Sequence, residues 1–260
     1  MPLSRCLLRW NRWLGVFLAV GLATTTACLA QQQPKQQPAP KTYSRANSFG
    51  ILFAYSNTSS HMLLGAARNR KLLNVGASYS RRLWMNRVVN WQYDAEFMPV
   101  ALESDPVKHE IDSVTSPVTI YQNFTYRDVA ACRPVNSSFN ATVGGVLFAS
   151  TQVVTCFREW TVGEAFSPIG FRWSFRPRHR LQPFLGGHGG EMYSTRPIPI
   201  DEAGSFNFTF DFDGGLEWYR AHQRSIRFEY RYHHISNHNT ANQNPGIDNG
   251  LFQVSYVFGH

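Results

Sequence analysis

Apolar and polar residues alternate with a period of two along much of the chain, and this pattern limits the fold more than any other feature. In FNFTFDFDGGLEW, residues 206–218, aromatic and aliphatic residues occupy one face and Asn, Thr, Asp and Glu the other. The same alternation occurs in VVNWQYDAEF, residues 88–97, and IGFRWSFR, residues 169–176. Successive side chains of a β-strand point to opposite faces, so the pattern predicts an all-β protein.

The composition of the two faces favours a membrane barrel over a soluble β-sandwich. Aromatic residues make up 14% of the chain and are concentrated on the apolar faces, while the polar faces repeatedly carry Asp, Glu and Arg. A soluble β-sandwich buries the apolar face of each sheet and exposes the polar face to water. An outer-membrane barrel turns the apolar face to lipid and fills its lumen with polar side chains, which explains opposite charges on one face.

The sequence predicts an antiparallel outer-membrane β-barrel of about eight strands, the smallest common number in single-chain barrels. The predicted strands lie near 48–57, 70–82, 87–100, 167–176, 180–194, 205–219, 224–237 and 248–258. Short and long connections alternate, which places both termini in the periplasm and the long loops outside the cell. The longest connection, residues 101–166, is interpreted as an extracellular insertion; a barrel of ten strands is the alternative.

The N-terminal residues resemble an export signal. Arg5, Arg9 and Arg12 precede the apolar stretch WLGVFLAVGLA and the small residues before Gln31. Residues 1–30 are therefore predicted to be a signal peptide, with an uncleaved anchor as the alternative. The Gln/Pro-rich residues 31–46 are predicted to be a flexible leader, and residues 47–260 the barrel domain in the bacterial outer membrane.

Cysteine content and charge add two expectations. Cys6 and Cys28 would leave with the signal peptide, so the exported chain would keep only Cys132 and Cys156. An even pair in an oxidising compartment is expected to form a disulfide. Loss of the three signal arginines would lower the formal charge from +8 to +5, a mild basicity that suits an anionic membrane surface, and the chain lacks the dense basic runs typical of nucleic-acid binding.

The strand SIRFEYRYHHIS, residues 225–236, carries the candidate catalytic residues. Its alternation places His234 and Ser236 on the lipid-facing side, and Asp248 shares the parity of the apolar residues in the next strand. These polar residues have two interpretations. They are either interfacial residues at the end of the aromatic belt, or a nucleophile, a general base and the acid that orients the base.

The segment HHISNHNTANQNPGID, residues 233–248, resembles the active-site segment of the lipid A 3-O-deacylase (PagL-type) family of outer-membrane barrels. The matching positions are His234, Ser236, Asn237, Asn244 and the tripeptide Gly246–Asp248. The resemblance implies hydrolysis of the acyl ester at the 3-position of lipid A, with lipopolysaccharide as the partner. It also implies that the two asparagines support the oxyanion or hold the loop. The family has glutamate where this chain has Asp248, which is one methylene shorter.

Two other functions are alternatives to ester hydrolysis. His233, His234 and His238 cluster in the sequence, but adjacent strand residues face opposite sides and no zinc-binding motif accompanies them. No metal and no cofactor are therefore expected. The second rival is a non-enzymatic barrel that keeps the fold without catalysis.

The signal-peptide interpretation makes a direct prediction. Exported protein should begin at Gln31, because the small residues before it suit signal cleavage. Intact mass spectrometry of protein purified from the outer membrane checks this. Retention of Met1 in the membrane-inserted protein would contradict it.

Overall fold

Ten antiparallel strands form the described part of the chain, residues 42–260, in a computed structural model. The strands are β1 (Asn47–Ser56), β2 (Lys71–Met85), β3 (Val89–Thr115), β4 (Thr119–Arg127), β5 (Val135–Val143), β6 (Val146–Phe175), β7 (Leu181–Ser194), β8 (Phe206–Ala221), β9 (Arg224–Ser236) and β10 (Ile247–Gly259). The predicted signal peptide lies outside the described residues. Within residues 42–260, no helix is long and apolar enough to cross a membrane.

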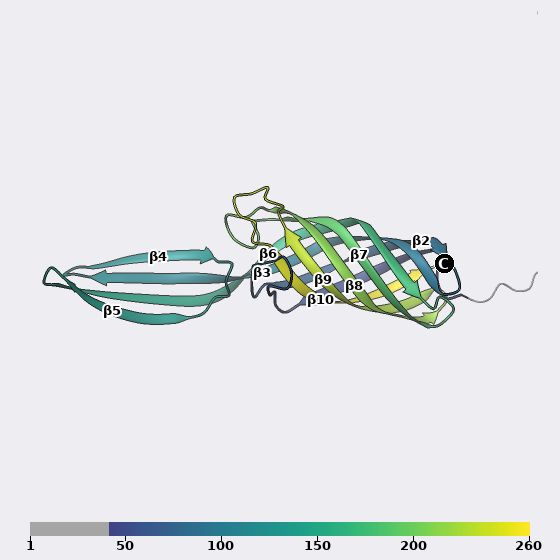
Figure 1. Cartoon of the computed structure of the whole chain (residues 1–260), viewed down its shortest axis with the longest axis horizontal. Coiled ribbons are helices and arrows are strands. Elements are labelled where there is room, and N and C mark those ends of the chain that lie inside the picture. The colour runs from purple at the N-terminus through teal and green to yellow at the C-terminus, as the bar shows by residue number, and fades with distance from the viewer. Residues whose placement is uncertain (1–41) are drawn as a thin grey trace, which may run out of the picture. The chain divides into compact units, whose positions relative to one another are not determined.

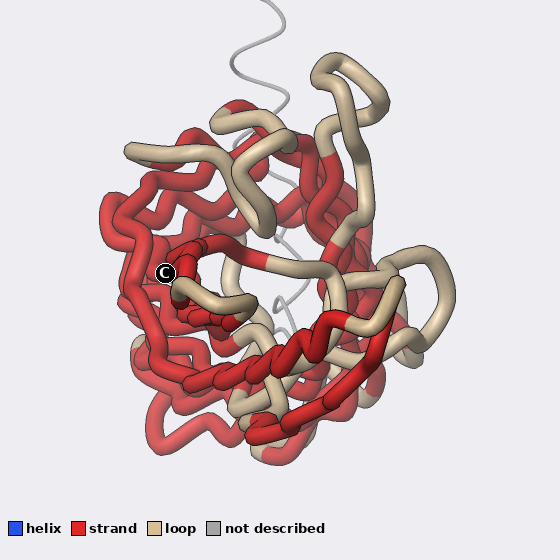
Figure 2. The backbone as a smooth tube through the Cα atoms, turned by 90° about the vertical axis from the view of Figure 1, so that its left-hand side faces the viewer, coloured by secondary structure: helices blue, strands red, loops and turns tan. Residues whose placement is uncertain are grey.

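Eight of these strands close into a ring, which confirms the predicted antiparallel barrel (Figures 1 and 2). The order is β3-β2-β1-β10-β9-β8-β7-β6, and the pairing of β3 with β6 joins the two ends. A closed ring leaves no strand edge unpaired, so every strand can satisfy its backbone N–H and C=O groups with its neighbours.

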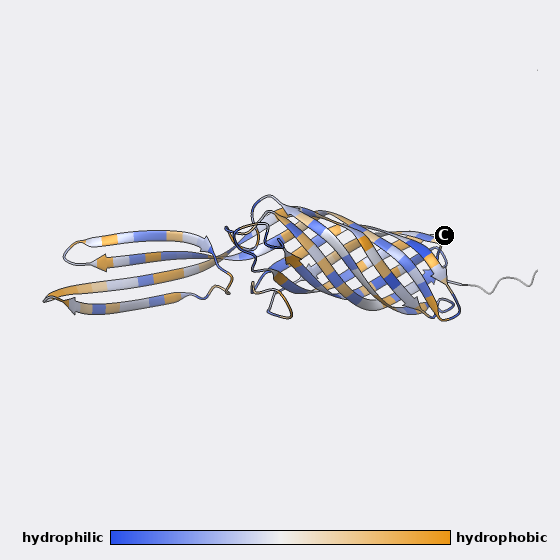
Figure 3. Cartoon of the chain, turned by 45° about the horizontal axis from the view of Figure 1, so that its top comes forward, coloured by the Kyte–Doolittle hydropathy of each residue, from blue (hydrophilic) through white to orange (hydrophobic). Residues whose placement is uncertain are grey.

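Hydrophobic and hydrophilic residues alternate along the barrel strands (Figure 3), and exposed and buried positions alternate with them as the sequence predicts. In β9, Phe228 and Tyr230 are 50% and 48% exposed on the outside. Their neighbours Arg227 and Arg231 are 1% and 2% exposed and point inward. The lumen is therefore filled by charged side chains, and the outer surface is apolar and aromatic.

The buried charges of the lumen are paired. Arg231 contacts both carboxylate oxygens of Glu96, at 2.7 and 3.0 Å. The same guanidinium contacts Glu229 at 2.5 Å and Asp211 at 3.2 Å. A buried charge is costly unless it is paired and hydrogen-bonded, so one arginine holds carboxylates from three other positions around the ring.

One end of the barrel contains both described termini and the short connections. Backbone N–H groups of Ala46 and Asn47 donate to the carbonyl of His260. Arg45 enters the lumen, where its guanidinium contacts Glu217 at 2.6 Å. The predicted leader, residues 31–46, overlaps the described residues only at 42–46, and there Ser44 and Arg45 are buried.

At the other end, β3 and β6 continue past the ring (Figure 1). The two strands remain paired with each other as far as Thr115 and Ala149. Along this stretch β4 pairs with β3, and β5 pairs with β6. The strand predicted to end near residue 100 and the strand predicted to begin near residue 167 are thus both much longer than predicted. The predicted insertion therefore consists largely of a four-stranded antiparallel extension of the barrel sheet, in the order β4-β3-β6-β5.

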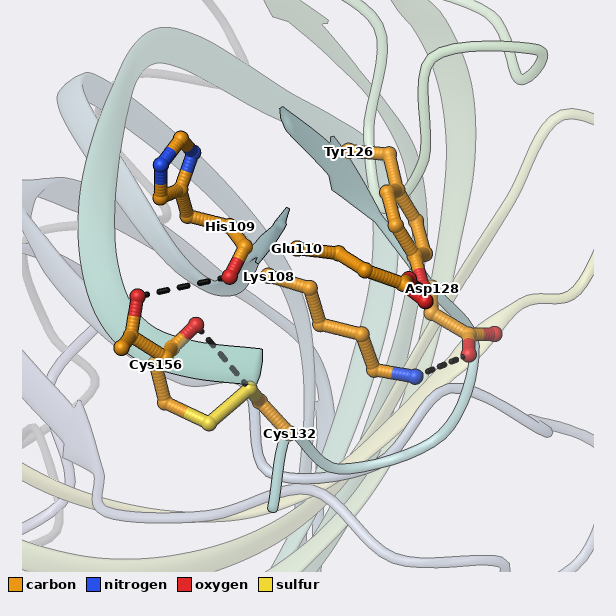
Figure 4. Close-up of a disulfide and its surroundings, with 8 residues drawn as sticks. Lys108, His109, Glu110, Tyr126, Asp128, Cys132 and Cys156 are labelled. Carbon is orange, nitrogen blue, oxygen red and sulfur yellow. Dashed lines mark hydrogen bonds and ion pairs between the residues drawn. A yellow bond between two sulfur atoms is a disulfide. The ribbon is translucent and has the colours of Figure 1, made fainter. Parts of the chain in front are cut away.

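A disulfide joins Cys132 to Cys156 at the base of this sheet, with a Cα–Cα distance of 5.9 Å (Figure 4). Lys108 and Asp128 form an ion pair of 2.6 Å beside it. The disulfide ties the segment between β4 and β5 to β6. It therefore restrains the longest loop of the sheet where the sheet leaves the barrel.

The lumen network predicts that Arg231→Ala is strongly destabilising. It leaves buried carboxylates of Glu96, Asp211 and Glu229 without their common partner, at a cost of roughly 3–5 kcal/mol. Urea unfolding in lipid vesicles, followed by tryptophan fluorescence, measures the change. Arg224→Ala is the control, because Arg224 is exposed on the same strand. Equal effects of the two substitutions would contradict the role of the network.

Candidate active site

The side chains of His234 and Asp248 meet across strands β9 and β10. The two residues are direct cross-strand partners, and His234 Nδ1 lies 2.7 Å from Asp248 Oδ1. Directly opposed residues of an antiparallel pair have Cβ atoms only about 4.5–5.5 Å apart. The side chain of aspartate therefore spans the gap, and a carboxylate on a longer side chain is not needed at this position.

Asp248 accepts further hydrogen bonds from the loop between β1 and β2, residues 57–70. Its Oδ2 accepts backbone N–H groups of Met62 at 3.3 Å, Leu63 at 2.7 Å and Leu64 at 2.9 Å. The phenol of Tyr232 donates to Oδ1 at 2.8 Å. These partners of Asp248 were not predicted, because no motif or periodic pattern of the sequence connects the loop with residue 248.

The loop explains why polar side chains on the lipid-facing side are covered. By parity His234 and Asp248 point outward, away from the lumen, yet they are 7% and 0% exposed. Phe210 packs on the imidazole with a centroid distance of 5.3 Å. The carboxylate is thus shielded from lipid by hydrogen-bonding backbone groups.

Ser236 occupies the last position of β9 on the same face as His234. It is half-buried and pairs with Phe208 of β8. Residues two apart on a strand are separated by roughly 6.6 Å along its axis. Among residues 42–260, no hydrogen bond of the Ser236 hydroxyl is found, and the His234–Ser236 contact is not formed.

Asn237 and Asn244 hold the loop between β9 and β10. The Asn244 side-chain oxygen accepts the backbone N–H of Asn237 at 3.0 Å. The Asn237 amide donates to the carbonyl of Gln243 at 2.7 Å and accepts the N–H of Asn239 at 2.9 Å. Both hydrogen-bonding groups of the Asn237 side chain are therefore occupied within the loop.

The three neighbouring histidines do not converge. His233 points into the lumen, where its Nδ1 lies 3.5 Å from Asp211. His234 faces outward, and exposed His238 packs against Phe208. Among residues 42–260, no group of three or more His, Cys, Asp or Glu side chains is arranged to hold a metal ion.

The His234–Asp248 pair is arranged for general base chemistry. If Nδ1–H is donated to the carboxylate, the neutral imidazole keeps its free lone pair on Nε2. A carboxylate in this position fixes the tautomer and stabilises the imidazolium that forms when Nε2 accepts a proton. The fold and this pair together define an outer-membrane β-barrel with a histidine–carboxylate pair on its outer surface.

Comparison with known proteins identifies the family. Residues 73–257 match the family model of lipid A 3-O-deacylase (PagL), so the chain belongs to that family and is a protein of the bacterial outer membrane. No curated protein sequence gives a significant match.

Two solved structures are similar to this chain. The crystal structure of the outer membrane enzyme PagL shares 12% identity with a TM-score of 0.43, covering 81% of this chain and 99% of that chain. The crystal structure of Neisserial surface protein A shares 13% identity with a TM-score of 0.39, covering 83% and 97%.

The loop contacts of Asn237 lead to a stability prediction. Asn237→Ala removes the bonds to Gln243 and Asn239 and should destabilise the loop locally by roughly 1–3 kcal/mol. Hydrogen exchange of residues 237–246 should accelerate, whereas exchange in β2 should not change. Asn242→Ala, an exposed position in the same loop, is the matched control. Identical exchange in both variants would show that Asn237 does not hold the loop.

Proposed function

We propose that the protein hydrolyses the ester-linked acyl chain at the 3-position of lipid A by a serine mechanism. Ser236 is the nucleophile, His234 the general base and Asp248 the acid that orients the imidazole. The observation that supports this best is the 2.7 Å contact between His234 Nδ1 and Asp248 Oδ1 on the outward side of the barrel. Family membership supplies the substrate class.

The proposed reaction proceeds in two steps. Ser236 Oγ attacks the ester carbonyl while its proton passes to His234 Nε2, and the imidazolium then protonates the departing sugar oxygen, which leaves as a hydroxyl with the acyl group on Ser236. His234 next removes a proton from water, which attacks the acyl-serine, and the imidazolium returns this proton to Ser236 Oγ as the fatty acid leaves. Ser236 must rotate toward His234 for the first transfer, because the two side chains are not hydrogen-bonded in this structure.

Backbone N–H groups are the proposed oxyanion donors. The N–H of His238 has no hydrogen-bond partner among residues 42–260, and it follows Ser236 by two positions. Asn237 supports this turn through its bonds to Gln243 and Asn239. Fixed donors of this kind stabilise the negative charge that develops on the carbonyl oxygen.

The position of the site on the barrel suits a membrane lipid. His234 and Asp248 lie at the end of the ring with the long connections, and in outer-membrane barrels long loops face the outside of the cell. Their outward orientation presents the pair to the outer leaflet. An ester near the lipid headgroup could then reach Ser236 without leaving the membrane.

The mechanism predicts that Ser236→Ala and His234→Ala each lower acyl release by roughly a thousandfold or more, because the residues of a working triad act as a unit. Mass spectrometry of lipid A and the released hydroxy fatty acid measures turnover. Ser138→Ala, at an exposed position of β5, is the control.

Heat-dependent gel mobility establishes that each variant remains a folded barrel. Wild-type turnover that persists in a folded Ser236→Ala barrel would refute the mechanism. A folded wild type that releases no acyl chain from lipid A would instead identify the non-enzymatic barrel.

A further inference from the structure

The loop between β1 and β2 is built onto the outer end of β10. Ser59 and Ala67 form isolated bridges with Asn249 and Ile247. Within this frame, the N–H of Ser60 donates to the backbone carbonyl of Asp248 at 3.2 Å. The segment 60–66 is therefore held against β10 at the residue proposed to orient the catalytic base.

We propose that the backbone of Met62–Leu64 positions Asp248 for catalysis and that the apolar side chains of this segment anchor it in the lipid layer. The inference rests on the proposed function for the catalytic role of Asp248. Three successive N–H groups converge on Oδ2, which leaves Oδ1 for His234 and Tyr232. Each carboxylate oxygen thus has its own set of partners, and this set fixes the plane of the carboxylate.

Gly65 permits the close approach of the segment. A Cβ atom at this position would lie 2.5 Å from Asp248 N, 2.7 Å from Ile247 C and 2.8 Å from Asp248 Oδ1. Two of these atoms belong to the backbone of β10 and cannot rotate away. Any larger residue must therefore lift the segment from the strand and separate its N–H groups from the carboxylate.

The side chains of the segment point away from the protein. Met62, Leu63 and Leu64 are 43%, 66% and 61% exposed. Met62 lines a recess together with Tyr230 and Phe252, which belong to the lipid-facing set of β9 and β10. The exposed apolar segment is therefore continuous with the surface that lipid covers, and the acyl layer is the occupant that its chemistry fits.

Anchoring and positioning follow from one segment because its side chains and its amides point in opposite directions. Transfer of the three side chains into the acyl layer holds the loop against β10. The seated loop then completes the hydrogen bonds of Asp248.

Hydrogen exchange tests the positioning without reference to activity. In vesicles of phosphatidylethanolamine and phosphatidylglycerol, the amides of residues 62–64 should be protected in the wild type and exchange at least tenfold faster in Asp248→Ala. Unchanged exchange would overturn the inference. Because this measurement needs no turnover, it decides the inference even if the wild type releases no acyl chain and the proposed function fails.

A double-mutant cycle tests whether Gly65 acts through Asp248. Gly65→Ala should lower kcat at least tenfold with little change in KM, and should add nothing in the Asp248→Asn background. Gly189→Ala is the control, since a Cβ there meets no atom within 4 Å. Equal fold-losses from Gly65→Ala in both backgrounds would indicate a general structural effect and overturn the positioning role.

The lipid anchor is tested by replacing Leu63 and Leu64 together with serine. In the same vesicles, this variant should lose the exchange protection of residues 62–64, while the barrel keeps its heat-dependent mobility. Val118→Ser removes an equally exposed apolar side chain from the sheet beyond the ring and should leave that protection intact. Full protection in the doubly substituted protein would overturn the anchoring part of the proposal.

Discussion

The pairing of β3 with β6 is the interaction on which the rest of the structure depends. It closes the ring, and closure gives every spanning strand a neighbour on both sides. Lipid offers no hydrogen-bond partners, so an open edge would be costly within the membrane. Closure also explains the period-two pattern, because each strand then has one face toward the lumen and one toward lipid.

The candidate site is an exception to this division. Lumen charges such as Arg231 are neutralised by other side chains of the interior. Asp248 has the outward parity, where no such network exists, and its charge is instead met by His234, Tyr232 and three backbone N–H groups. The N–H groups of the β1–β2 loop thus stabilise one carboxylate on the outside of the barrel, and the arginines stabilise several carboxylates in the lumen.

The barrel could be predicted from the sequence because alternation is a local property that can be recognised in each strand separately. The outward parity of His234 followed from the residues before it in β9. The length of β3 and β6 was not predicted, since the Ser, Thr and Asn residues around 113–142 weaken the alternation. The loop contacts of Asp248 were also missed, because they join positions more than 180 residues apart through backbone groups that leave no mark in the sequence.

The substitution of aspartate for the glutamate of the family pattern shows what the sequence alone could not decide. The side chain of Asp248 is one methylene shorter than glutamate, and this difference alone does not decide whether the carboxylate reaches His234. The register of β9 and β10 places the two residues directly opposite each other, and the distance between Nδ1 and Oδ1 is 2.7 Å. Reach is therefore determined by strand register, which residue type does not reveal.

The most direct test of the account is to trap the nucleophile. A long-chain alkylphosphonate ester, presented in lipid vesicles, should form a covalent adduct with the serine that His234 activates. Peptide mass mapping should then place the adduct on Ser236, and His234→Ala should lose the labelling. An adduct on another residue, or labelling of Ser236 that is as fast without His234, would contradict the account.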